Sequence, residues 1–300
     1  MSSVIDLLLG ESVHAGFRLR QSAHWPNVGI HPWTSMERLQ VLTIKERLTR
    51  DGLIMVMGVG RVMNPTLYQI IGMHGGFHAL WFDQEHCGLT YEQLEIGTLA
   101  ARAHGLDSFV RVAPTDYAVV TRSMEAGASG IMAAQVFSAD QAEEIVRWAK
   151  FVPRGIRGLN NSGFDGRYGA FPLAEHCERA NRESFVAIQI ETAQSVEDCD
   201  AIAAIDGVDM LFIGPADLSQ SLGVTGEFFH PKCLAAVDRV AAACKKHGKH
   251  WGAVTVNAEH ADLYISKGCK MVSPTNDARL INVGLQAVKE QFVRLFAGEV

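Results

Sequence analysis

The chain has 300 residues, of which 48% are hydrophobic and 20% are charged, and its formal net charge is −6. This composition is typical of a folded globular protein and excludes a fibrous or largely disordered chain. The negative charge gives no electrostatic reason to expect nucleic acid or an anionic membrane as a partner, because both favour basic surfaces. We therefore expect small molecules, or further copies of the chain, as partners.

The cysteines and the apolar runs predict a cytoplasmic location. The six cysteines form no C-x-x-C pair and no zinc-like spacing, which is typical of reduced thiols. The first ten residues contain a short apolar run without a basic residue before it, which does not fit a secretory signal. No segment approaches the roughly 18 apolar residues that a membrane span requires.

From about residue 50 onwards, short runs rich in Val, Ile, Phe and Met alternate with longer segments of helical period. Eight runs are predicted as strands: 53–59, 79–83, 108–112, 130–134, 185–190, 209–213, 250–256 and 270–274. Segments between them, such as 91–104 and 231–247, place apolar residues three and four positions apart, as helices packed on a sheet do. Eight strands alternating with helices favour a closed (β/α)₈ TIM barrel over an open doubly wound sheet.

Two segments do not fit the simple repeat. Residues 1–45 precede the first strand, and we expect an N-terminal arm, or a helix that caps the base of the barrel or packs on another subunit. Residues 46–300 are then the catalytic barrel domain. Residues 152–184 form a long connection rich in glycine and arginine, which is either a lid over the site or a surface excursion.

Functional residues of such a barrel lie at the carboxyl ends of its strands and in the loops that follow. Polar side chains gather at this rim after four predicted strands: Asp83, Glu85, His86, Arg111, Gln189, Glu191 and Asp217. Glu191 and Asp217 follow consecutive strands, so both carboxylates are able to face one mouth, where their hard oxygens suit Mg²⁺ or Mn²⁺. Each of them taken singly is more often a helix N-cap.

The other rim residues also have two interpretations. Arg111 lies in a core strand and needs an anionic partner, which is either a structural carboxylate or a developing oxyanion. His86 follows Asp83 by three residues, so the carboxylate is able to orient its imidazole for proton transfer, although a surface-loop histidine is the alternative. Gly214-Pro215-Ala216 is either an anion-binding turn or an ordinary link between a strand and a helix.

A lysine Schiff base is the main covalent alternative to a metal in aldolase chemistry. Lys249 and Lys270 fall at the amino ends of predicted strands. The remaining lysines fall in predicted helices or ahead of the barrel: Lys45, Lys150, Lys232, Lys245, Lys246, Lys267 and Lys289. No lysine is predicted at the catalytic rim, which favours a metal as the electron sink.

Five segments, in this order, resemble the HpcH/HpaI family of metal-dependent pyruvate aldolases: FDQEHCGL, VRVAPTD, PRGIRG, VAIQIET and MLFIGPADLS. The resemblance covers about residues 41–300. It implies a TIM barrel of the phosphoenolpyruvate/pyruvate-binding type. It also implies a homo-oligomer, a trimer or a hexamer built as a dimer of trimers, with the last helix exchanged between neighbouring subunits.

The resemblance also implies roles for individual residues. It implies that Glu191 and Asp217 are metal ligands, that Arg111 stabilises the enolate, and that His86 with Asp83 is a proton-transfer dyad. It further implies that Gln189 lies near the metal and pyruvate, and that Gly214, Pro215 and Ala216 belong to the pyruvate carboxylate pocket. The sequence departs from the family pattern at Gln84, Cys87 and Gly88, and at Arg61 after the first strand, so the family pattern does not predict the acceptor aldehyde.

The resulting hypothesis is reversible cleavage of a 4-hydroxy-2-oxo acid to pyruvate and an aldehyde, in aromatic or sugar acid catabolism. The expected cofactor is Mg²⁺ or Mn²⁺, with Co²⁺ or Zn²⁺ as alternatives, and Arg61 is a candidate for reading a distal carboxylate. One alternative is decarboxylation of oxaloacetate with C–C bond formation, as in the related macrophomate synthase. The others are a citrate lyase β-type enzyme acting on a CoA thioester, which the His86 and Asp83 motif disfavours, and a non-enzymatic 2-oxo acid sensor.

Overall fold

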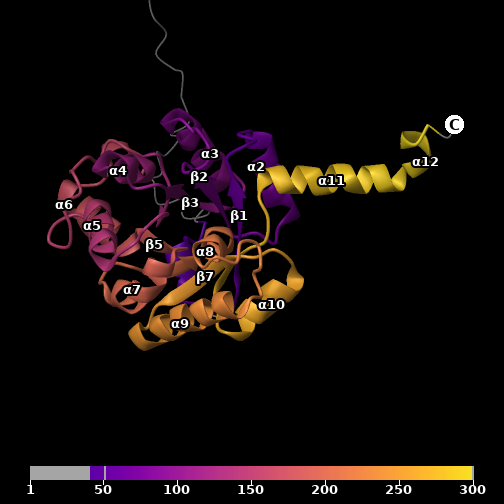
Figure 1. The fold of residues 1–300 in the computed structure, drawn as a ribbon. Helices are drawn as coiled ribbons and strands as arrows, with labels where there is room; N and C mark the ends of the chain where they lie inside the picture. Colours follow the sequence, from indigo (N-terminus) through magenta and orange to yellow (C-terminus); the bar gives the residue numbers. More distant parts are fainter. Residues whose placement is uncertain (1–40, 51, 299–300) are drawn as a thin grey trace, which may run out of the picture. The chain divides into compact units, whose positions relative to one another are not determined.

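Eight parallel strands pair in chain order in the computed structural model, and the eighth pairs with the first, so the sheet closes into a barrel (Figure 1). The structure describes residues 41–50 and 52–298. The strands are β1 (Ile54–Val59), β2 (Ala79–Asp83), β3 (Asp107–Val112), β4 (Gly130–Ala133), β5 (Phe185–Ile190), β6 (Met210–Ile213), β7 (His250–Val254) and β8 (Met271–Ser273). Each lies at one of the eight predicted runs, and the predicted (β/α)₈ barrel is confirmed.

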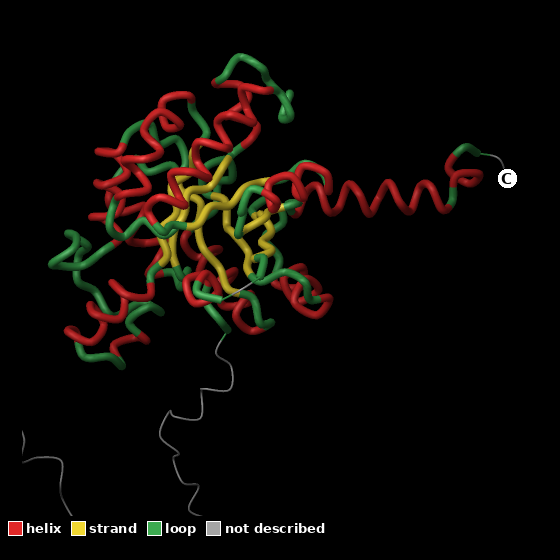
Figure 2. The backbone as a smooth tube through the Cα atoms, turned by 90° about the horizontal axis from the view of Figure 1, so that it is seen from below, coloured by secondary structure: helices red, strands yellow, loops and turns green. Residues whose placement is uncertain are grey.

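Helices enclose the strands, as Figure 2 shows with helices in red and strands in yellow. Those that follow strands or connect them are α2 (Pro65–His74), α3 (Tyr91–Ala103), α4 (Tyr117–Glu125), α5 (Ala139–Ala149), α6 (Leu173–Glu183), α7 (Ala193–Ala204), α8 (Pro215–Ser221), α9 (Pro231–His247), α10 (Ala258–Ser266), α11 (Asp277–Gln291) and α12 (Val293–Phe296). Within the described ranges, none of the helices combines the length and apolarity needed to cross a bilayer.

Alternation along the strands divides the core into two clusters. One side of each strand packs against helices, as Phe82 and Val110 do. The other side fills the barrel interior, where Trp81, Phe109 and Ala187 belong to a separate buried cluster. Because successive side chains of a strand point to opposite faces, Asp83, Arg111, Gln189 and Glu191 continue the inward series at the carboxyl ends of β2, β3 and β5.

A short helix, α1 (Ile44–Leu48), covers the amino-terminal end of the barrel. Ile44 and Leu48 belong to the inner cluster with Phe109 and Phe185, and the Ile44 N–H donates to Asp107 Oδ2 at 2.6 Å. Thr43 caps this helix and Glu46 completes a capping box. Residues 1–40 of the predicted N-terminal extension lie outside the described residues, so the predicted domain boundary at residue 45 stays a prediction.

The glycine- and arginine-rich connection is not an unbroken loop, because it contains a 3₁₀ turn, η2 (Arg167–Gly169), and helix α6. Only His176 of α6 is buried, so this helix has no apolar stripe from which periodicity could predict it. The connection leads into the amino end of β5. It also packs near the ends of α3 and α4, where Arg102 lies over the Phe164 ring and the Phe164 N–H donates to Glu125 O. These contacts favour the surface excursion over a lid on this barrel's own mouth.

Candidate active site

Arg111 and Asp83 form a buried ion pair between neighbouring strands at the barrel mouth. Arg111 Nε and Nη2 donate to Asp83 Oδ1 and Oδ2 at 3.0 and 2.7 Å, and the two residues are partners in the β2–β3 register. The Cζ atom of the guanidinium lies 4.6 Å from the centroid of the Trp81 ring, and this ring forms the floor of the mouth. Burial alone would raise the pKa of Asp83, but Arg111 and the N–H groups of His86 and Glu85 hold it below its usual value.

Glu85 is a second partner of Arg111; the sequence analysis placed it at the rim but predicted no role for it. Its Oε2 lies 3.0 Å from Arg111 Nη1, but without hydrogen-bond geometry, and it is buried. Burial raises the pKa of Glu85; the charges of Asp83 and Asp217 act in the same direction, against those of Arg111 and His86. Glu85 could have been found from its place in the D-x-E-H run at the end of a core strand.

His86 does not make the predicted contact between its imidazole and Asp83. Its backbone N–H donates to Asp83 Oδ1 at 3.2 Å, while the ring Nε2 lies 3.7 Å from Glu85 Oε2 and is exposed. The reason is that Asp83 Oδ1 already accepts from the Glu85 N–H and from Arg111, which leaves the carboxylate facing the backbone turn and β3. Glu85 therefore replaces Asp83 as the carboxylate beside the ring.

Glu191 is fully buried and held by amide groups from β5 and from the loop that follows β4. Its Oε1 accepts from the backbone N–H of Gln135 at 2.8 Å and from Gln135 Nε2 at 3.1 Å, and its Oε2 accepts from Gln189 Nε2. Burial raises the pKa of Glu191 to about 7; the charges of Glu85 and Asp217 add to this, and the Gln135 N–H opposes it. A nearby cation would stabilise its carboxylate form.

Gln135 was missed by the sequence analysis, although it directly follows the run predicted as the fourth strand. Its φ of 52° lies in the left-handed region, which a glutamine adopts only where its surroundings hold it there. The two hydrogen bonds from Gln135 to Glu191 supply that hold, so Gln135 positions the carboxylate.

The helix-cap interpretation of the two predicted metal ligands does not match the structure. α7 is capped by Thr192 with Ser195, not by Glu191. Gly214 is the N-cap of α8 without a side-chain cap bond, and Asp217 lies within the first turn. Asp217 is half-buried, and its charge raises the pKa of both Glu85 and Glu191, so the three carboxylates share the mouth.

Gly214 lies too close to the buried amide and carboxylate for any other residue. A Cβ at this position would be 2.5 Å from both Gln189 Nε2 and Glu191 Oε2. Pro215 is buried as the first residue of α8, and Ala216 is exposed. This turn therefore brings the start of α8 directly against Gln189 and Glu191.

The residues of the mouth fit a hard divalent cation. Glu85 Oε2 and Gln189 Oε1 are buried and have no hydrogen-bond partner within the described ranges. Such oxygens, beside carboxylates whose pKa is raised, indicate missing positive charge. Glu191, Asp217 and the Gln189 amide oxygen are the candidate ligands. The described residues contain no group of three His, Cys, Asp or Glu side chains arranged to hold a metal, so water or substrate would complete a shell here.

Arg61 lies in the turn after β1, beside the pair of Asp83 and Arg111. The preceding Gly60 packs so closely that a Cβ there would be 2.9 Å from Cys87 Sγ and 3.4 Å from Asp83 Cβ. Arg61 itself is exposed and forms no ion pair with any other described residue. The structure thus brings every predicted site residue to the carboxyl-end rim.

Comparison with known proteins identifies the family. A family model described as HpcH/HpaI aldolase/citrate lyase matches residues 63–282. The chain belongs to this family. The sequence resemblance is thereby confirmed, and the chain is an enzyme of the lyase class, of the aldolase type.

Relatives of the HpcH/HpaI family match most of the chain. A 4-hydroxy-4-methyl-2-oxoglutarate aldolase of Hapsidospora irregularis is 36% identical over 200 residues, which are 65% of this chain and 73% of the relative. A 5-keto-4-deoxy-D-glucarate aldolase of Klebsiella pneumoniae is 29% identical over 229 residues, 76% of this chain and 88% of the relative. The crystal structure of an HpcH/HpaI aldolase from Desulfitobacterium hafniense has a TM-score of 0.77 at 30% identity, and covers 83% of this chain and 97% of that one.

Proposed function

We propose that the chain is a divalent-metal-dependent aldolase that reversibly cleaves a 4-hydroxy-2-oxo acid to pyruvate and an aldehyde. The observation that carries this proposal is the buried cluster of Glu85, Gln189 and Glu191, with Asp217 beside it and Arg111 next to it. The names of the two aldolase relatives support a 2-oxo acid as the substrate.

Glu191, Asp217 and Gln189 would hold the cation. When bound, a divalent cation polarises the carbonyl of a 2-oxo acid and lowers the free energy of its enolate. Asp83 accepts from Nε and Nη2 of the Arg111 guanidinium, and Glu85 pairs with its charge beside Nη1, so three of the five N–H groups remain for the substrate. We propose that these donate to the 2-oxo oxygen as negative charge develops there.

His86 is the proposed proton acceptor for the 4-hydroxyl group. Its ring is exposed at the rim and has Glu85 as its neighbouring carboxylate, which favours the protonated imidazolium during cleavage. The loss of this proton as the C3–C4 bond breaks leaves the aldehyde and the pyruvate enolate. The return of one proton to C3 of the enolate completes pyruvate.

The cleavage reaction tests this proposal. Chelator-treated protein is expected to release no pyruvate from 4-hydroxy-4-methyl-2-oxoglutarate or 5-keto-4-deoxy-D-glucarate, and Mg²⁺, Mn²⁺ or Co²⁺ is expected to restore release, measured by coupled reduction of pyruvate. Borohydride is expected to trap no substrate on the protein, because the mouth uses no lysine. Full turnover after exhaustive chelation, or a lysine adduct, would contradict the proposal.

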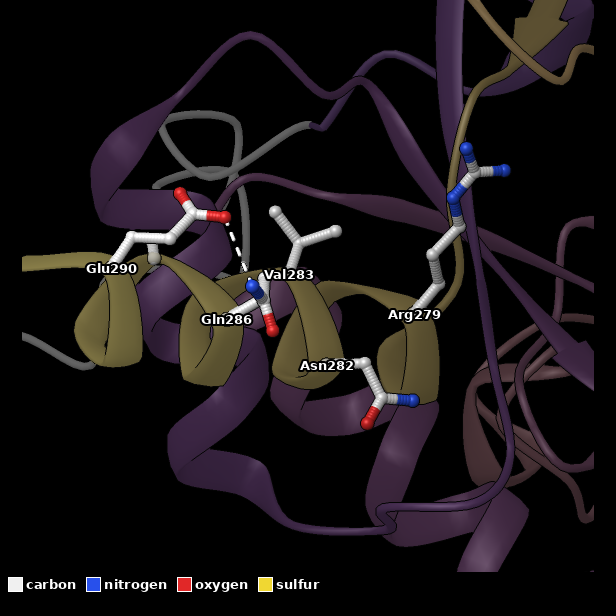
Figure 3. A pocket seen from close by; sticks show the side chains of 6 residues that line it. Arg279, Asn282, Val283, Gln286 and Glu290 are labelled. Carbon is white, nitrogen blue, oxygen red and sulfur yellow. Dashed lines mark hydrogen bonds between the residues drawn. The ribbon is translucent and has the colours of Figure 1, made fainter. Parts of the chain in front are cut away.

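We further propose that the chain assembles into an oligomer through α11. This helix leaves the barrel after β8, and every described residue from Ile281 to Gly298 is exposed (Figure 1). Ile281, Leu285, Val288 and Phe292 form an exposed apolar stripe at helical spacing. Asn282, Gln286 and Glu290 follow another, polar face of the same helix (Figure 3).

A second copy of the chain offers a place for this stripe. In a regular barrel the helix after β8 would pack between α10 and α2. Apolar side chains of those two helices, Ile70, Met73 and Ile265, are exposed. The apolar stripe of α11 and the apolar side chains of α2 and α10 are thus both exposed. This pair of exposed surfaces favours exchange of α11 between subunits.

Light scattering tests the assembly. The wild type is expected to be a trimer or hexamer, and Leu285→Glu with Val288→Glu is expected to lower the molar mass, because charge would enter the buried stripe. Gln286→Glu, on the polar face, is the matched control and should leave the mass unchanged. A monomeric wild type, or an apolar-face variant with the wild-type mass, would contradict assembly through α11.

A further inference from the structure

Asp277 holds the turn that follows β1, although more than two hundred residues separate them along the chain. Its Oδ2 accepts three backbone N–H groups, from Gly60, Arg61 and Val62, each at 2.8 Å. Its Oδ1 accepts the N–H of Ala278 at 2.8 Å, and the residue is 2% exposed. Charge-assisted bonds to three consecutive N–H groups fix the backbone of this turn.

The turn carries Arg61 to the barrel mouth. Gly60 lies against Cys87 and Asp83, so the turn packs directly on the residue that pairs with Arg111. Burial and the Asp83 charge raise the pKa of the Cys87 thiol, and the nearby charge of Arg61 opposes this rise. β1 is also tied to the β8–α11 connection, because the Gly58 N–H donates to Thr275 O.

The two arginines of this rim differ in how their charges are balanced. Arg111 faces two carboxylates, Asp83 and Glu85. Arg61 has no acidic partner within the described ranges, and Asp277 binds its backbone N–H rather than its side chain. Arg61 therefore keeps its donors for an anionic group that arrives with the substrate.

We propose that Asp277 is a positioning residue: it holds the Gly60–Val62 turn so that Arg61 meets an anionic group on the aldehyde half of the substrate. This inference rests on the proposed aldolase function. Arg61 then selects for charge on the aldehyde. This selection depends on the contact that Asp277 makes with the turn from the first turn of α11.

A pair of acceptors of similar size tests the inference in the direction of C–C bond formation. Glyoxylate carries a carboxylate, and acetaldehyde carries a methyl group in its place. With pyruvate as donor, the ratio of kcat/KM for glyoxylate to that for acetaldehyde measures charge selection. The wild type is expected to favour glyoxylate, and Arg61→Gln to lower the ratio by about 10- to 100-fold, the effect of one hydrogen-bonded charge.

Asp277→Asn keeps the shape of the side chain but weakens its bonds to the turn. It is expected to lower the same ratio several-fold, mainly through a higher KM for glyoxylate and with the KM for pyruvate unchanged. The double variant with Arg61→Gln should be no worse in this ratio than Arg61→Gln alone, because Asp277 acts through Arg61. Arg50→Gln, an exposed arginine at the opposite end of the barrel, is the control and should keep the wild-type ratio.

An unchanged ratio in Arg61→Gln, or additive losses in the double variant, would overturn the inference while leaving the proposed function intact. Consumption of neither aldehyde by the wild type in the presence of Mg²⁺ or Mn²⁺ would overturn both. If Asp277→Asn does not fold, Asp277→Glu provides the test, because it keeps the charge but displaces the turn. The ratio of kcat/KM values should then fall. A wild-type ratio would overturn the role of Asp277.

Discussion

Replacing Glu191 with glutamine is expected to lower turnover by about 10³-fold or more, since the loss of a ligand removes several kcal/mol of cation-dependent enolate stabilisation. The change keeps the size of the side chain and its acceptor for Gln135, and it replaces the oxygen that faces Gln189 with an NH₂ group, to which the Gln189 amide can turn its oxygen. Because burial raises the pKa of Glu191 to about 7, the neutral amide should not lower the melting temperature.

The stability of the Glu191→Gln variant separates a functional loss from a folding defect. Glu197→Gln, on the exposed face of α7, is the matched control and should keep wild-type turnover. Metal affinity, measured by calorimetry on chelator-treated protein, should fall in Glu191→Gln alone. Wild-type affinity and turnover in that variant would show that Glu191 does not hold the cation.

Replacing Arg111 with lysine is expected to lower kcat by about 10²- to 10³-fold, the size of effect seen when one donor to a developing oxyanion is removed. Lysine keeps the charge but not the fork that joins Asp83 through two nitrogens and Glu85 through the third. The two buried carboxylates would lose partners, so the free energy of unfolding should also fall.

Arg122→Lys is the control for the Arg111 variant. Arg122 is exposed on α4 and lies over the Tyr91 ring of α3, so a lysine there should change neither kcat nor stability appreciably. Steady-state kinetics at saturating metal would separate the two variants. A kcat for Arg111→Lys within about threefold of the wild type would exclude transition-state stabilisation by the guanidinium.

The sequence pattern predicted the barrel because each strand is a short apolar run followed by a helix of clear period. It also predicted which rim the polar residues share, since strand ends in a parallel barrel lie at one edge. Helix α6 was not predicted, because its single buried residue, His176, leaves no apolar stripe.

The missed site contacts depend on the three-dimensional arrangement rather than on local pattern. Gln135 adopts a left-handed φ that only its bonds to Glu191 explain. Asp277 meets its three N–H partners across the closure of the barrel between β8 and β1. Asp83 was expected to orient His86, but the Asp83 side chain points inward from β2 and pairs with Arg111 instead. Spacing along the chain cannot reveal which of the two partners Asp83 binds.

The exchange of the C3 protons of pyruvate for deuterium in D₂O tests the central claim most directly, because it requires the enolate but no aldehyde. The wild-type protein, freed of metal and then given Mg²⁺ or Mn²⁺, is expected to exchange these protons, and the chelated protein is not, as measured by mass spectrometry. Exchange that persists without any cation, or that no divalent cation restores, would contradict a cation held by Glu191 and Asp217.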